Sequence, residues 1–131
     1  MDYYPNQPPR VAFSNVTLTA TFAGNRKTFE TGGMQKLSLD FKYLQGATES
    51  ANALEFQLEH SADLGITWHS LVIDSTSTVS VLTPRVWQIT NDNNVNVIVD
   101  IAYKLMRISL RETGVVTNFG TATVTQTLSG L

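Results

Sequence analysis

The sequence predicts an all-β protein, an antiparallel β-sandwich of about eight or nine strands of jelly-roll type with an extended N-terminal arm. Apolar and polar side chains alternate in most segments between turns, which is the period of a strand with one face in a core. Turn-forming residues separate these segments at short spacing, and no segment has a sustained helical period. We therefore expect residues 1–10 to form the arm and residues 11–131 to form one sandwich domain.

The first ten residues, MDYYPNQPPR, contain Pro5, Pro8 and Pro9. Proline fixes φ and lacks a backbone N–H, so this segment is expected to be an extended arm and not a central strand. Tyr3 and Tyr4 are suited to anchor it. We expect these five residues to make contacts with a partner.

The next part of the chain is expected to form strands at residues 16–22, 28–31, 36–43 and 53–61. Val16, Leu18, Ala20 and Phe22 alternate with threonines, which predicts a half-buried strand. The polar segment 45–52 is expected to be a loop, and it is the place best suited to a helical turn.

The remaining strands are expected at residues 68–73, 79–81, 86–89, 95–103, 106–111 and 119–128. In the segment 95–103, Ile98 and Ala102 add apolar side chains to the face opposite the valines. A strand that is apolar on both faces is typical of a central position in a sheet, and we expect one here.

One motif stands out, the segment Ser61-Ala62-Asp63-Leu64-Gly65-Ile66-Thr67-Trp68, which fits the S-x-D-x-G-x-T-W pattern of an Asp-box. Its specified residues are Ser61, Asp63, Gly65, Thr67 and Trp68. In such a hairpin the carboxylate accepts hydrogen bonds from backbone N–H groups, the glycine takes a positive φ, and the tryptophan folds onto the sheet. The motif predicts a tight structural turn and no reaction.

Candidates for catalysis or metal binding have simpler interpretations. His60 and His69 flank the Asp-box symmetrically and are expected to be a cross-strand pair, but two histidines without a third ligand make a weak metal site. Glu55 and Glu59 lie too far apart along one strand for a glycosidase pair, and are expected to be solubilising charges. The arginines are dispersed along the chain. We expect no enzyme activity, no cofactor and no metal.

Composition narrows the partners further. The net charge is −2, only 15% of residues are charged, and there is no cysteine. No basic patch for nucleic acid and no apolar run long enough for a membrane span is visible, so we expect neither partner. A sugar platform would have to use Trp87, Tyr3, Tyr4 or Tyr43, and Trp87 is the candidate interaction residue of the domain itself.

Four features follow one another along the chain: the Pro-rich leader, the Asp-box hairpin, the run YKLMRISLRETG (103–114) and the Thr-rich last strand FGTATVTQTLSG (119–130). This order of features resembles the small β-sandwich virion proteins of tailed bacteriophages. It implies a non-enzymatic virion protein for capsid decoration or head-to-tail or tail assembly, with capsid, portal or tail subunits as partners in a homo-oligomer or symmetric array. The same pattern fits carbohydrate-binding or discoidin-like sandwiches, so a glycan-binding module is the alternative.

Overall fold

The computed structural model of the chain describes residues 8–46, 51–70, 80–83, 86–90, 93–101, 104–114 and 117–130. Within these ranges it forms ten strands and one short 3-10 helix. They are β1 (Arg10–Thr17), η1 (Phe22–Gly24), β2 (Asn25–Glu30), β3 (Lys36–Leu44), β4 (Ala53–Ser61), β5 (His69–Ser70), β6 (Ser80–Thr83), β7 (Val86–Thr90), β8 (Asn93–Asp100), β9 (Leu105–Thr113) and β10 (Thr121–Ser129). Tyr3, Tyr4 and Pro5 of the expected arm, and Ala102, lie outside the described residues.

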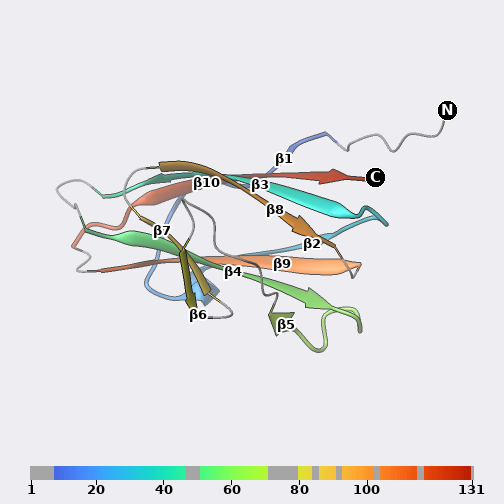
Figure 1. Cartoon of the computed structure of the whole chain (residues 1–131). Helices are drawn as coiled ribbons and strands as arrows, with labels where there is room; N and C mark the ends of the chain where they lie inside the picture. The colour runs from blue at the N-terminus through green and yellow to red at the C-terminus, as the bar shows by residue number, and fades with distance from the viewer. Residues whose placement is uncertain are drawn as a thin grey trace.

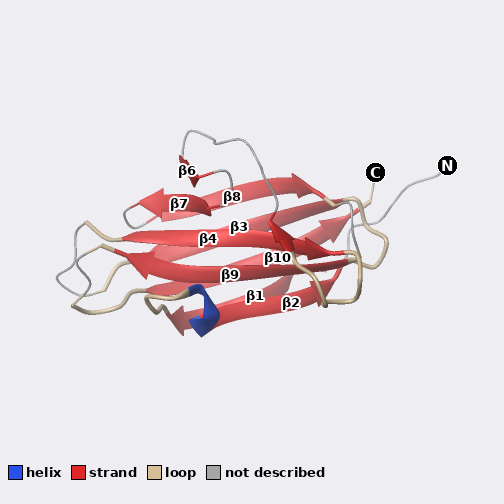
Figure 2. Ribbon diagram, turned by 90° about the horizontal axis from the view of Figure 1, so that it is seen from below, coloured by secondary structure: helices blue, strands red, loops and turns tan. Residues whose placement is uncertain are grey.

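The strands form two antiparallel sheets packed face to face, as the two layers of Figure 1 show. The first sheet has the order β1-β10-β3-β8. The second sheet, which can be followed in Figure 2, has the order β2-β9-β4-β7-β6, with β5 paired to β4. Successive long strands therefore cross between the sheets, which is the interleaved pattern of a jelly roll. The predicted fold class is confirmed.

The core lies between the inner faces of the two sheets. From the first sheet, β3 contributes the buried side chains of Leu37, Leu39, Phe41 and Tyr43. From the second sheet, β4 contributes those of Leu54, Phe56 and Leu58. The rings of Phe41 and Phe56 approach to 4.6 Å between centroids across the interface. Alternation at period two therefore selects the buried face of each strand, as the sequence predicts.

Trp87 belongs to this core and is 0% exposed. On β7 it alternates inward with Ile89, it pairs in register with Phe56, and its ring stacks on that phenylalanine at 5.7 Å. The expectation that Trp87 contacts a partner or a sugar is therefore wrong for this fold, because the ring has no surface left to offer.

A buried carboxylate connects the two sheets at one end. Glu112 of β9 is 2% exposed, and its side chain accepts hydrogen bonds from the Tyr43 hydroxyl of β3 at 2.5 Å and from the Gly120 N–H at 2.7 Å. Tyr43 is itself fully buried. Because a buried carboxylate must be hydrogen-bonded to be tolerated, these two donors hold the sheets in one alignment.

The first strand differs from its prediction in position. β1 spans Arg10–Thr17, so it begins at the last residue of the expected arm and ends before most of the predicted strand 16–22. The pairing of β1 with β10 has two register shifts, and Asn15, with a φ of +47°, lies in the second of them, between Phe13 and Val16. These shifts break the alternation. The chain then crosses between sheets: the Leu18 N–H donates to the Gly120 carbonyl, and the Thr19 carbonyl accepts from the Glu112 N–H.

One further expectation is wrong. β8 is an edge strand of the first sheet and not a central one, because it pairs with β3 alone in the described part of the chain. Its outward Ile98 is 62% exposed. The short helix that the structure does describe is η1, and residues 47–50 of the expected polar loop lie outside the described residues.

Candidate contact site at the Asp-box end of the sandwich

The Asp-box connects β4 to β5 in a turn held by side-chain hydrogen bonds. Ser61 Oγ donates to Asp63 Oδ1 at 2.7 Å and accepts from the Gly65 N–H at 2.9 Å, while Asp63 Oδ1 accepts from the Thr67 N–H at 2.8 Å. The Thr67 N–H, then the Ser61 hydroxyl, lower the pKa of Asp63 from 3.8 to about 2. Gly65 has a φ of +92°. The turn thus has the geometry that the pattern predicts.

The tip of this turn presents two aliphatic side chains to solvent. Leu64 is 87% exposed and Ile66 is 84% exposed. Leu64 also has a φ of +62°, a conformation that is uncommon for residues other than glycine, asparagine and aspartate. The hydrogen bonds of Ser61 and Asp63 hold this unfavourable backbone, so the tip is a fixed apolar projection.

The base of the turn is anchored on the outer face of the second sheet. Trp68 is half-buried, and the guanidinium of Arg107 lies 4.3 Å from the centroid of its ring. The same guanidinium binds both carboxylate oxygens of Glu59, at 2.8 and 3.1 Å. A bidentate pair stacked on an aromatic ring fixes the arginine more firmly than a simple surface ion pair does.

A second unit of this kind lies four residues along the same strands. Arg111 donates to Glu55 at 2.6 Å and places its guanidinium 4.2 Å from the centroid of the Phe22 ring. Glu55 is only 4% exposed. The expectation that Glu55 and Glu59 are solubilising charges is therefore wrong. The signal for the pairing was present in the sequence, because Arg107 and Arg111 have the same four-residue spacing as the two glutamates.

Beside the tip lies a hollow of about 440 Å³, lined by Glu30, Gly32, Gly33, Leu64, Lys104 and Leu105. Gly33 has a φ of +77°, and a Cβ placed on it would meet no atom within 4 Å, so the hollow is open there. Glu30 and Lys104 have opposite charges, yet neither takes part in the ion pairs found among the described residues. Their carboxylate and ammonium groups are left to face solvent or a partner.

His60 and His69 are the cross-strand pair that the sequence predicts, in register between β4 and β5 with ring centroids 5.9 Å apart. Burial, followed by the charge of His69, lowers the pKa of His60 below 6.5. Among the described residues, no group of three or more potential metal ligands is close enough to hold an ion. Protonation of His60 is therefore disfavoured in the folded hairpin.

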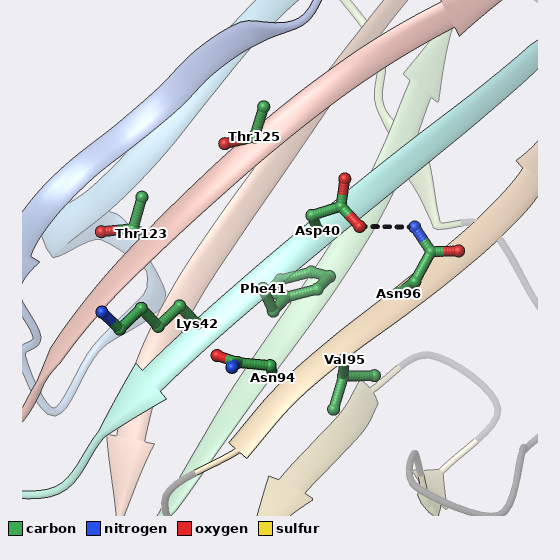
Figure 3. Close-up of a pocket in the computed structure, with 8 residues that line it drawn as sticks. All are labelled: Asp40, Phe41, Lys42, Asn94, Val95, Asn96, Thr123 and Thr125. Atoms are coloured by element: carbon green, nitrogen blue, oxygen red, sulfur yellow. Dashed lines mark hydrogen bonds between the residues drawn. The ribbon is translucent and has the colours of Figure 1, made fainter.

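A second, polar hollow of about 410 Å³ lies on the outer face of the first sheet (Figure 3). Asp40, Lys42, Asn96, Thr123 and Thr125 present side chains there from β3, β8 and β10. Asn96 donates to Asp40 at 2.7 Å, and Thr123 Oγ1 accepts from the N–H of Asn15 at 2.9 Å. This surface therefore presents both hydrogen-bond donors and hydrogen-bond acceptors.

The other predicted contact residues fall in two places. Pro8 and Pro9 are exposed directly before β1, and Tyr3, Tyr4 and Pro5 precede the described residues. The described part of the chain contains no helix with the length and apolar character needed to cross a membrane. The chain matches no protein-family model, and a search of curated proteins finds no significantly similar sequence.

Proposed function

We propose that this protein is a non-enzymatic contact module that binds another protein subunit through the tip of its Asp-box hairpin. One observation carries the proposal: Leu64 and Ile66 are almost fully exposed on a turn that hydrogen bonds hold in place. A rigid apolar projection loses little conformational entropy when it enters a partner, so its burial contributes efficiently to affinity. The tip is thus built for attachment.

The state of the charged groups supports a role without catalysis. The carboxylates of Glu55 and Glu59 are bound by arginines, and that of Glu112 is bound by Tyr43 and Gly120. These groups stabilise the sandwich, whereas an acid or base in a reaction must face a substrate. These three carboxylates of the second sheet are used for the fold.

We further propose that the module belongs to the virion of a tailed bacteriophage, in capsid decoration or in head-to-tail or tail assembly. The resemblance of the leader, hairpin and last strands supports this setting, and jelly rolls are a fold that viral capsid domains use. Capsid, portal or tail subunits, or further copies of this chain in a homo-oligomer, would then be the partners. In a symmetric particle, a modest affinity at each copy is multiplied by the array.

The test is quantitative mass spectrometry of purified virions from the phage that encodes the chain. We expect the wild-type protein at a fixed ratio to the capsid or tail proteins. Leu64→Asn removes the aliphatic side chain, and asparagine suits the positive φ. This variant should therefore fold normally but be incorporated into virions poorly. Ile98→Asn, at an exposed position on β8, is the matched control and should incorporate normally. A wild-type protein absent from virions refutes the virion setting, and normal incorporation of Leu64→Asn refutes the role of the tip.

A second candidate function, glycan binding, is favoured by the polar hollow of Figure 3. Adjacent hydroxyls of a sugar need donors and acceptors together, and Lys42, Asp40 and Asn96 supply both. A glycan array probed with the wild-type protein and with Asn96→Ala tests this function. Binding lost in the variant supports it, whereas an array without hits removes it.

A further inference from the structure

We propose that the Asp-box end is self-complementary, so that the subunit bound by the tip is a second copy of this chain. In a two-fold dimer, Leu64 and Ile66 of each copy enter the hollow beside Gly33 of the other. This inference rests on the proposed function, since it names the partner of the same tip. It yields a closed assembly, because a two-fold interface uses one patch on both copies.

The placement of the tip and the hollow fits a two-fold interface. Leu64 belongs to the projection and also forms one wall of the hollow, so the two features are adjacent on one patch. A two-fold axis beside Leu64 would place each tip over the other hollow and bring the two leucines together. The missing side chain at Gly33 and the aliphatic wall of Leu105 provide space and apolar contact for the incoming group.

The charges at the rim agree with the same symmetry. Glu30 ends β2 and Lys104 precedes β9, and both line the hollow. Among the described residues neither forms an ion pair within its own chain. A two-fold axis through the patch would bring Glu30 of each copy toward Lys104 of the other, and thus form two equivalent pairs. A partner of a single charge sign would satisfy only one of the two groups.

Sedimentation velocity of the full-length protein, over concentrations up to about 1 mM, tests the inference. We expect a concentration-dependent dimer in the wild type. Leu64→Asn should weaken dimerisation at least about tenfold. At concentrations too low for the dimer, its melting temperature should equal or exceed that of the wild type, because asparagine tolerates the positive φ. Ile98→Asn should dimerise as the wild type does. A wild-type protein that stays monomeric throughout overturns the inference.

Charge reversal gives a second readout that is specific to a self-complementary interface. Glu30→Lys and Lys104→Glu alone should each weaken the dimer, because each creates two like-charge contacts across the axis. The double variant exchanges the signs and should regain most of the wild-type dimerisation. A dimer indifferent to all three variants also overturns the inference.

The two proposals fail in different ways. A monomeric wild type whose Leu64→Asn variant is excluded from virions refutes self-association and keeps the contact function. A wild-type dimer that depends on Leu64, combined with normal incorporation of the Leu64→Asn variant, refutes the role of the tip in virion attachment and keeps self-association. The virion assay and the sedimentation assay therefore separate the identity of the partner from the place of the protein.

Discussion

The hydrogen bond between Tyr43 and Glu112 can be removed almost without changing the shape of the core. Tyr43→Phe deletes only the hydroxyl, so no cavity larger than one oxygen atom remains in the buried site. The carboxylate of Glu112 then keeps the Gly120 N–H and loses its second donor. A hydrogen bond to a charged group contributes about 1.5–3 kcal/mol, so we expect the free energy of unfolding to fall by about 2 kcal/mol.

The expected shift in melting temperature follows from the size of the chain. At about 2.1 cal/mol/K per residue, 131 residues have an unfolding entropy of about 275 cal/mol/K. A loss of about 2 kcal/mol therefore lowers the melting temperature by about 7 °C. Urea unfolding followed by tryptophan fluorescence measures the free energy directly, since the ring of Trp87 is fully buried in the folded state.

The charge of the acceptor supplies the control. In a Glu112→Gln background the same Tyr43→Phe change removes a neutral hydrogen bond, which contributes about 0.5–1.5 kcal/mol. The double-mutant cycle should therefore give a positive coupling energy between the two side chains. A loss below about 0.5 kcal/mol for Tyr43→Phe, or the same loss in both backgrounds, would refute the proposed connection between the sheets.

Three further predictions follow from the turns and their charges. The folded-state pKa of His60 lies below 6.5, so the contribution of its neutral form to stability is fully present above pH 6.5 and is lost as the pH falls through the lowered pKa. Melting curves recorded against pH should show this loss, and His60→Gln should remove it. Asp63 has a folded-state pKa of about 2 instead of 3.8, so it stabilises the hairpin above pH 3.8 and loses this effect as pH falls to about 2; an NMR titration of its carboxyl carbon with a midpoint near 3.8 would contradict this. Gly120→Ala should destabilise the fold by more than about 2 kcal/mol, because its Cβ would lie 2.2 Å from the Leu44 carbonyl oxygen. The Cβ of Gly33→Ala would meet open space, so this variant should lose only about 1 kcal/mol, from its positive φ. Chemical denaturation measures both losses.

Period-two alternation predicted the strands well where one face is buried along the whole strand. The predicted segments 36–43, 53–61 and 119–128 correspond closely to β3, β4 and β10. The prediction failed where apolar residues do other work. Leu18 is buried in the crossing between the sheets, and Phe22 lies under the guanidinium of Arg111. Local periodicity does not distinguish such contacts from the inward face of a strand.

The candidate site was predictable only in part, and for a physical reason. The five Asp-box positions lie close together in sequence, so a local pattern is sufficient to specify their hydrogen bonds. The hollow is formed by three separate segments, at residues 30–33, 64 and 104–105. Only the jelly-roll order, in which β2 lies beside β9 and β9 beside β4, brings these segments to one end. The spacing of residues in the sequence does not predict that these three segments lie together.

The conformation of Leu64 distinguishes folding from function at this end of the molecule. Glycine or asparagine would occupy a φ of +62° with less strain than leucine does, so the turn itself gains nothing from a bulky aliphatic residue there. Burial cannot account for the leucine either, because its side chain is 87% exposed. A residue that disfavours its own backbone and contacts little of its own core is the observation on which the proposed contact outside the chain rests. The Leu64→Asn variant separates the two effects, since it should stabilise the isolated protein while weakening its assembly.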